Sequence, residues 1–350
     1  MFSYLFLYLI ASFSAMSIAH RTVIRSSTLV WTFMGMLLTI MIGWRHHVGG
    51  DWNNYLRRFR DIADASFTYT MEQSDMGYQL LVYWMNAWGF DIYAVNFLSA
   101  MLFVTGLIAL LRRELNPWLG LTVAIPYLII VVSMGYTRQG VAVGLVMWGL
   151  ASLDKKQFIR FLFFIALAAS FHKSAVLMIA FGIFSHGKGK WLKALAVLFA
   201  GMGIWLSFVE TDSADLWKNY VEAQMQSQGA LIRVILNFLP ALLLLAFRKQ
   251  WKMYFNDYTL WFMVALASIA SVVAVNFAST AVDRMALYFI PIQIIVYARL
   301  PFLARHLLSP KVTTILIVLF YGAVLLVWLN YAVNARYWLP YKNMLFMGLF

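Results

Sequence analysis

The chain has 350 residues, of which 63% are hydrophobic and only 12% are charged, and its formal net charge is +13. Soluble domains contain about 25% charged residues, so this composition excludes a soluble fold and predicts an all-α, polytopic integral membrane protein. The chain contains no cysteine, which excludes a disulfide framework, a thiolate metal site and a cysteine nucleophile.

Hydrophobic segments of membrane-spanning length follow one another along the chain. The first, Met1–Ala19, lacks the basic start of a cleavable signal peptide, so we interpret it as a transmembrane helix. A short apolar stretch, Tyr78–Trp88, is expected to re-enter the membrane or to lie along its surface. In chain order, the sequence predicts about twelve helices, near residues 2–19, 28–43, 92–111, 118–135, 137–153, 158–171, 174–185, 191–209, 231–247, 257–276, 285–300 and 312–329.

The basic residues are distributed unevenly between the predicted loops. With both termini outside, most of the 27 lysines and arginines fall in cytoplasmic loops such as 112–117, 154–157 and 248–256. The outer loops, near 44–91 and 210–230, are then close to neutral. The positive excess is therefore a topology signal, and nucleic acid is not an expected partner. We interpret residues 1–350 as a single transmembrane domain.

The outer segment Gly43–Asp64 is rich in arginine, histidine and aspartate. Its large apolar residues recur at helical spacing, at Trp52, Tyr55, Phe59 and Ile62. One interpretation is a helix lying on the lipid headgroups, with Arg57, Arg58 and Arg60 in solvent. The Gly49-Gly50 pair that precedes this helix is expected to let the backbone approach a ligand closely.

Five polar residues are not explained by that helix. Arg45 and Asp51 lie at the end of a predicted span, Arg138 and Arg284 each open another span, and His172 lies at the apex between two short helices. Each alone is as compatible with a structural role as with a functional one, because arginine can snorkel and histidine can cap. Their convergence at one depth from separate segments favours a substrate site.

The residue types indicate the kind of substrate. Arginine binds phosphate through a planar pair of donors, and histidine can act as a general base toward a hydroxyl near neutral pH. Residues that suit sugar faces and hydroxyls also occur outside, at Trp52, Asn53, Asn54, Tyr55, Trp338, Tyr341 and Asn343. Together these residues favour a lipid-linked saccharide that carries a diphosphate.

At these residues the chain resembles the EpsG-type branch of the Wzy polysaccharide polymerases. The matching motifs, in order, are Arg45…Gly49-Gly50-Asp51…Tyr55, Asp75-Met76-Gly77-Tyr78, Arg138-Gln139-Gly140-Val141-Ala142, Lys155-Lys156, Phe171-His172-Lys173-Ser174-Ala175, Asp283-Arg284…Tyr288 and Leu339-Pro340-Tyr341-Lys342. The resemblance runs over nearly the full length with similar spacing. One departure is that the family more often has threonine where this chain has Gly50.

The resemblance implies a GT-C-like bundle in a bacterial inner membrane, with both termini periplasmic. It implies a membrane glycosyltransferase that needs no metal or other cofactor and polymerises undecaprenyl-diphosphate-linked oligosaccharide repeat units at the outer face. The acceptor hydroxyl would attack the donor anomeric carbon, and lipid diphosphate would leave. The implied partners are the lipid-linked oligosaccharides, the bilayer, a chain-length regulator and a flippase.

The resemblance also implies roles for individual residues. Arg138 and Arg284 would hold the diphosphate, assisted by Arg45. His172 would be the general base or would orient the acceptor, whereas Asp51 would either orient Arg45 or be the rival base. The tyrosines expected in the same site are Tyr55, Tyr288 and Tyr341.

Two other functions remain open. A flippase or another transporter of lipid-linked oligosaccharides would place charges near the midplane of the membrane and would commonly show internal repeats, which this sequence lacks. A non-catalytic subunit of an exopolysaccharide assembly complex is the third candidate, and only an activity assay separates it from the polymerase.

Overall fold

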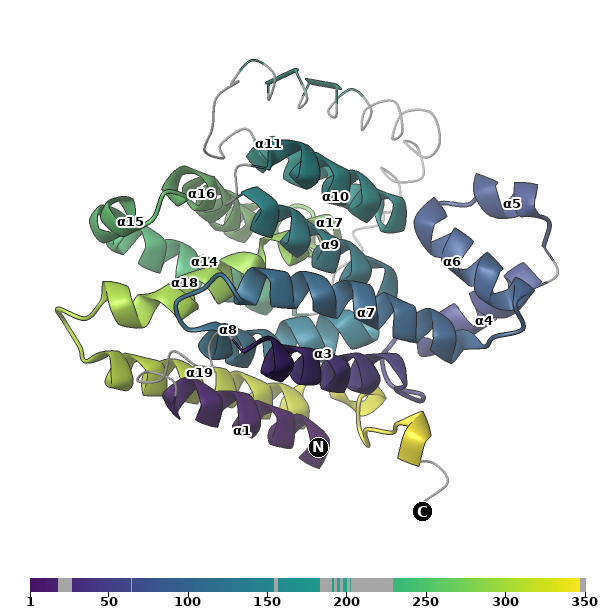
Figure 1. Cartoon of the computed structure of the whole chain (residues 1–350), viewed down its shortest axis with the longest axis horizontal. Coiled ribbons are helices and arrows are strands. Elements are labelled where there is room, and N and C mark those ends of the chain that lie inside the picture. The colour runs from purple at the N-terminus through teal and green to yellow at the C-terminus, as the bar shows by residue number, and fades with distance from the viewer. Residues whose placement is uncertain are drawn as a thin grey trace.

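The structure is a computed structural model (Figure 1) that describes residues 1–17, 27–63, 65–153, 157–182 and 229–346, with isolated helical positions between 191 and 202. Within these ranges every regular element is a helix. The one β-type pairing among the described residues is an isolated antiparallel bridge between Arg45 and Asn343. The predicted all-α fold is therefore confirmed.

Four apolar helices form the first layer of the bundle. They are α3 (Thr28–Gly43), α7 (Ile92–Leu111), α9 (Thr137–Leu153) and α10 (Phe158–Phe171), and they pack side by side in that order (Figure 1). Their bounds coincide with predicted helices, because uninterrupted apolar runs between polar loops are the strongest helix signal in a membrane sequence.

The second layer surrounds one central helix. Its core is α8 (Pro117–Ala124), which continues as a π-helical segment, Ile125–Ser133, and all residues of both are buried. Around α8 pack α1 (Phe2–Ser17), α18 (Pro291–Leu303) and α19 (Pro310–Tyr331). Two further helices, α14 (Ala230–Ala246) and α16 (Tyr258–Ala274), pack against each other, and α14 also contacts α18.

Short elements gather at one end of the bundle. They are α4 (Trp52–Ala63), α5 (Phe67–Glu72) and α6 (Met76–Ala87), seen at the right of Figure 1. The C-terminal segment, with η6 (Val333–Tyr337) and η7 (Met344–Phe346), lies at the same end. It pairs with the loop after α3, where the His46 amide donates to the Lys342 carbonyl at 3.0 Å.

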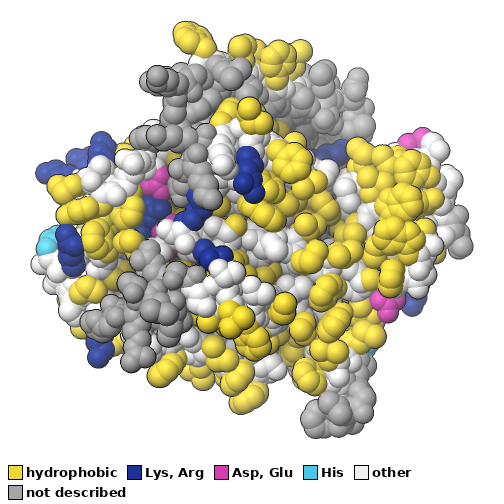
Figure 2. All heavy atoms as spheres, in the orientation of Figure 1, with side chains coloured by type: hydrophobic (Ala, Val, Ile, Leu, Met, Phe, Trp, Pro, Cys, Tyr) yellow, Lys and Arg dark blue, Asp and Glu magenta, His cyan; other side chains and the backbone are white. Residues whose placement is uncertain are grey.

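Several hydrogen bonds join segments that are predicted to lie on the same side of the membrane. At the predicted inner end, Arg112 donates to Thr28 at 3.3 Å and Asn116 donates to the Ala15 carbonyl at 3.2 Å. The loop after α3 and the C-terminal segment, which bond to each other, are both predicted outside. Figure 2 shows lysine and arginine side chains along the edge where α15 (Arg248–Tyr254) lies, with a mainly hydrophobic surface toward the other end.

The helix lengths bear on the number of membrane spans. Two described helices, α7 and α19, are long and apolar enough to cross a membrane, and two bent pairs raise this number to four. The pairs are α14 with α15, bent by 75°, and 279–289 with α18, bent by 44°. The other apolar helices have 10–17 residues, so at about 1.5 Å per residue they are shorter than the bilayer core. About twelve spans therefore stays a prediction.

Parts of the sequence analysis fall outside the described residues. These parts are most of the predicted helix 191–209, the outer loop 210–230 up to its last two residues, and the Lys155-Lys156 turn. The stretch Tyr78–Trp88 falls largely in α6, so it is helical, and its relation to the membrane surface remains a prediction.

The expectation that the apolar face of α4 lies on lipid headgroups was wrong. Its apolar residues Trp52, Tyr55 and Ile62 are only 6%, 8% and 4% exposed, because that face packs against the protein. An amphipathic pattern does not distinguish a lipid surface from a protein surface as the apolar partner. The arginines of α4 therefore lie on a helix that is anchored to the bundle.

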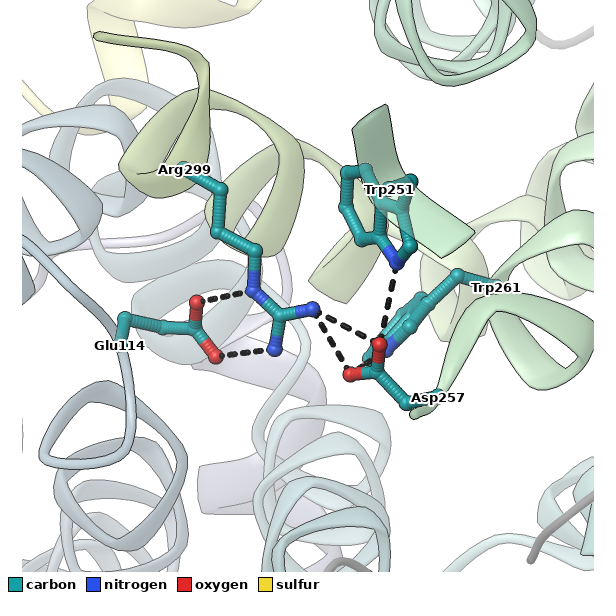
Figure 3. A network of polar contacts seen from close by, with 5 residues as sticks. All are labelled: Glu114, Trp251, Asp257, Trp261 and Arg299. Atoms are coloured by element: carbon teal, nitrogen blue, oxygen red, sulfur yellow. Dashed lines mark hydrogen bonds and ion pairs between the residues drawn. The ribbon is translucent and has the colours of Figure 1, made fainter. Parts of the chain in front are cut away.

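A buried ion network joins α18 to the loops that precede α8 and α16, at the predicted inner end of the bundle (Figure 3). Arg299 of α18 binds Glu114 through Nε at 2.7 Å and Asp257 through Nη1 at 2.8 Å. The same Asp257 carboxylate accepts hydrogen bonds from the indoles of Trp251 and Trp261, each at 3.0 Å. The three charges are therefore structural, because each is neutralised by a specific partner.

Candidate active site

A cavity of about 420 Å³ opens at the end of the bundle that carries α4. It lies between α4, the start of α9 and α17 (Ser279–Ala286). Its lining residues are Asp51, Asn54, Tyr55, Arg57, Arg58, Asp61, Arg138 and Arg284. Four arginines and two aspartates line the cavity, so its net charge is positive and it suits an anionic ligand. Asp51, Tyr55, Arg138 and Arg284 are the predicted site residues that it brings together.

Arg138 is held by two neighbours. Its Nη1 lies 2.6 Å from Oδ2 of Asp75, and its backbone amide donates to the Tyr55 hydroxyl at 3.4 Å. Asp75 has left-handed backbone angles, φ 60° and ψ 54°, which aspartate tolerates better than most residues. The role of Asp75 could not be predicted from its motif, since the sequence around a loop carboxylate does not reveal its partner.

Gly77 brings this aspartate close to His172. A Cβ atom at Gly77 would lie 2.4 Å from the Ser170 hydroxyl oxygen, so only glycine lets the start of α6 pack this closely against the end of α10. His172 follows α10 directly. The negative charge of Asp75 acts to raise the pKa of His172, which indicates that the two side chains share one electrostatic environment.

His172 is oriented by two hydroxyl groups. Its Nδ1 lies 2.6 Å from the Ser174 hydroxyl and 3.2 Å from the Tyr288 hydroxyl. Burial, with smaller contributions from the charges of Arg138 and Arg284, lowers the pKa of His172 to about 4 against the opposing effect of Asp75. The imidazole is therefore neutral at pH 7 and able to accept a proton.

The tautomer of His172 decides what it can do. If Nδ1 carries the proton, it donates to Ser174, and Nε2 has a free lone pair that can act as a base. If Ser174 donates to Nδ1 instead, Nε2 carries the proton and can only donate to a substrate oxygen. Ser174 belongs to the same sequence motif as His172, but the motif alone did not predict their hydrogen bond.

Asp51 is the second candidate base and lies directly before α4. Its Oδ1 accepts a hydrogen bond from the Asn54 amide at 3.4 Å. Burial raises the pKa of Asp51, whereas the Asn54 hydrogen bond and the charges of Arg138 and Arg284 lower it. Both His172 and Asp51 thus remain compatible with proton transfer.

Arg284 lies in the last turn of α17. Its carbonyl accepts a hydrogen bond from the Gln139 side chain at 2.7 Å, which joins α17 to α9 beside Arg138. The preceding Asp283 instead binds Arg233 of α14, whose Nε lies 2.6 Å from its Oδ1. Arg233 was not predicted to belong near the site, although an arginine within an apolar helix usually indicates a functional or paired position.

Arg45 lies outside the cavity lining. It is 1% exposed, and its guanidinium donates to the Ile42 carbonyl at 2.6 Å and to the Thr137 hydroxyl at 2.8 Å. Burial lowers the pKa of Arg45 to about 10, so it remains charged at neutral pH. Arg45 therefore holds the loop after α3. These hydrogen bonds, and not the expected contact with Asp51, fix the orientation of its guanidinium.

Tyr341 and Gly49 also serve the packing of that loop. The Tyr341 hydroxyl donates to the Met41 carbonyl at 2.9 Å. Gly49 has φ +105°, and a Cβ atom there would lie 2.3 Å from the Met134 carbonyl oxygen. The close approach expected at the glycine pair is thus made to protein backbone, and Gly49 does not line the cavity.

No group of three or more histidines and carboxylates in the described ranges could hold a metal ion, so no ligand set can be named there. Comparison with protein-family models gives a match to the EpsG family over residues 28–343, which include all the cavity residues. Comparisons with curated proteins and with solved structures give no match.

Proposed function

The chain belongs to the EpsG family of Wzy-like polysaccharide polymerases, and from this premise we propose that its outer cavity joins lipid-diphosphate-linked oligosaccharide repeat units. The observation that carries the proposal is the cavity lined by Arg138 and Arg284, whose charges also reach His172, a residue outside the cavity lining. Phosphate-binding donors and a proton acceptor then lie within one site, as glycosyl transfer from a lipid diphosphate requires.

The two arginines bind and neutralise the donor diphosphate. Arg138 comes from α9 and Arg284 from α17, so they approach the cavity from different elements. Each guanidinium can bind phosphate oxygens through two parallel hydrogen bonds. Because negative charge grows on the leaving diphosphate, these contacts strengthen in the transition state and lower the barrier.

The acceptor hydroxyl supplies the nucleophile. Its oxygen forms a bond to the donor anomeric carbon while the bond from that carbon to the diphosphate oxygen breaks. The electron pair of the broken bond leaves with the lipid diphosphate, and the hydroxyl proton passes to Nε2 of His172 or to Asp51. Arginines perform the charge neutralisation, so the proposed reaction needs no metal ion.

We place the cavity at the periplasmic face of a bacterial inner membrane, with both termini on that side. Support comes from the basic residues, which gather in loops at the opposite end of the bundle. Asn53 is exposed on α4, and the chain has no cysteine. Asn53→Cys should therefore be labelled by an impermeant thiol reagent from outside, and labelling from the cytoplasm alone would reverse the topology.

The position of the charges favours the polymerase over a transporter. The cavity lies where α4, the start of α9 and the end of α17 meet, at one end of the bundle. A flippase would need its charged groups nearer the middle of the membrane. A non-catalytic subunit would share the cavity geometry, so activity decides between that role and a polymerase.

The deciding experiment is reconstitution of the purified chain in liposomes. The substrate is a defined undecaprenyl-diphosphate-linked repeat unit, supplied with a chelator and without nucleotide sugar. We expect polymer from the wild type and a loss of about 10²-fold or more in Arg138→Lys and Arg284→Lys, because lysine lacks the planar fork. Arg60→Lys, on α4 but outside the cavity lining, is the matched control. Absence of polymer from the wild type, or normal polymer from both variants, would refute the proposal.

A further inference from the structure

The helix α4 presents its polar face to the cavity, opposite the apolar face that packs against the protein. Asn54, Arg57, Arg58 and Asp61 line it and follow the spacing i, i+3, i+4 and i+7, which places them along one side of a helix. Tyr55, with Trp52 and Ile62, anchors the helix to the protein. The arginines of this face are thus held by a fixed element, and Arg60 is not among the cavity residues.

Arg58 differs from the other partly buried arginines near the site. Arg138 binds Asp75, and Arg233 binds Asp283. Arg58 is half-buried, yet within the described part of the chain it makes no hydrogen bond or ion pair. Burial lowers the pKa of Arg58, and the like charge of Arg138 lowers it further, against smaller opposing effects that include the charge of Asp75. A cation in that position is unfavourable unless an anion joins it.

The proposed reaction brings two lipid diphosphates to one site, one on the donor and one on the acceptor. The charges of Arg138 and Arg284 both act on the pKa of His172, so the diphosphate that leaves belongs at these two arginines. We propose that Arg57 and Arg58 form a second anion subsite, which takes the diphosphate of the acceptor lipid. This inference rests on the proposed function and assigns to α4 a role in positioning the acceptor.

The size and openness of the site agree with this assignment. The cavity volume of about 420 Å³ falls within the range of about 300–1,000 Å³ that is typical of ligand sites. Arg57 is exposed and Arg58 is half-buried. The acceptor diphosphate does not react, so its subsite must bind it but need not exclude water. The acceptor sugar, in contrast, must reach the donor beside Arg138.

The test counts bound lipids and does not depend on polymer formation. Undecaprenyl diphosphate without sugar is added to the protein in nanodiscs that contain excess phosphatidylglycerol, and native mass spectrometry counts the bound molecules. We expect two in the wild type and in Arg60→Gln, but one in Arg58→Gln, whose affinity for the second molecule should fall about 10- to 100-fold. The double variant Arg57→Gln/Arg58→Gln should also bind one.

Three results would overturn the subsite. They are a single bound molecule in the wild type, two equally bound molecules in the double variant, and displacement of the second molecule by phosphatidylglycerol. In kinetics, Arg58→Gln should raise KM for the acceptor lipid about 10-fold or more and leave kcat and the donor KM unchanged. If two lipids bind as expected but the wild type makes no polymer, the proposed function fails and the subsite stands.

Discussion

The carboxylate of Asp75 lies 2.6 Å from the guanidinium of Arg138, the arginine proposed to bind the donor diphosphate. An incoming diphosphate must therefore share Arg138 with Asp75 or replace it. When the diphosphate replaces it, the Asp75 charge is freed near His172, where it raises the pKa of the imidazole. Substrate binding would thus make His172 a stronger base at the moment when a base is needed.

Asp75→Asn tests this coupling. The variant loses the anion that competes for Arg138, so we expect equal or tighter binding of undecaprenyl diphosphate. It also loses the charge that supports protonation of His172, so kcat should fall about 10-fold or more. Binding and kcat are measured on the same preparation, with Asp75→Glu as the control that keeps the charge. Weaker binding with unchanged kcat would show that Asp75 only holds the structure.

The pH profile of polymerisation reports the state of His172. Burial lowers its pKa to about 4, so the base is already neutral well below pH 6.5. We therefore expect kcat/KM, which reports the free enzyme, to stay level between pH 6 and 8 and to fall only as the pH approaches 4, where the imidazole takes up a proton. Initial rates in liposomes across this range test the expectation. An acid limb centred near 6.5 would contradict a buried, neutral histidine.

Replacement of the candidate bases decides between them. His172→Gln keeps a hydrogen bond but cannot accept a proton, so it should cost about 10²–10⁴-fold in kcat if His172 is the base. If it retains the wild-type rate while Asp51→Asn is inactive, the role belongs to Asp51. Ser174→Ala removes the hydroxyl 2.6 Å from Nδ1, so it should lower kcat with little change in KM. Ser152→Ala, whose hydroxyl bonds to the Trp148 carbonyl in α9, is the control.

Most helices could be predicted from the sequence, whereas the pairing of charges could not. The bounds of α3 and α7 follow from apolar runs, which depend only on neighbouring residues. The pairs Asp75–Arg138 and Asp283–Arg233 join residues far apart in the chain, so no local pattern reveals them. For the same reason Arg45 resembled a ligand-binding residue until its distant partners, Asn96 and Thr137, were known.

The ion network around Arg299 is expected to contribute strongly to the free energy of unfolding. Arg299 binds Glu114 and Asp257 at the opposite end of the bundle from the cavity. Removing one partner leaves a buried charge, so Glu114→Gln should reduce the free energy of unfolding by about 3–5 kcal/mol. Thermal unfolding in detergent measures the loss, with Arg305→Gln, whose residue lies on the exposed surface, as control. A normal unfolding temperature would show that solvent compensates the charge.

The loop before α4 gives a prediction that separates two adjacent glycines. A Cβ atom at Gly49 would lie 2.3 Å from the Met134 carbonyl oxygen, and its φ of +105° disfavours any side chain. At Gly50 the nearest atoms, in the Trp338 ring, are 4.0 Å from such a Cβ atom, which is ordinary contact. Gly50→Thr should therefore keep both the unfolding temperature and polymer formation.

Gly49→Ala should instead shift the loop and with it Asp51, the next residue but one, at the edge of the cavity. The strain costs about 1–3 kcal/mol, and displacement of Asp51 should lower kcat beyond the loss of folded protein. Unfolding temperature and polymerisation per folded molecule, measured for both variants, separate the two effects. Equal behaviour of Gly49→Ala and Gly50→Thr would mean that the loop can move away from Met134 without cost, and that its geometry does not set the position of Asp51.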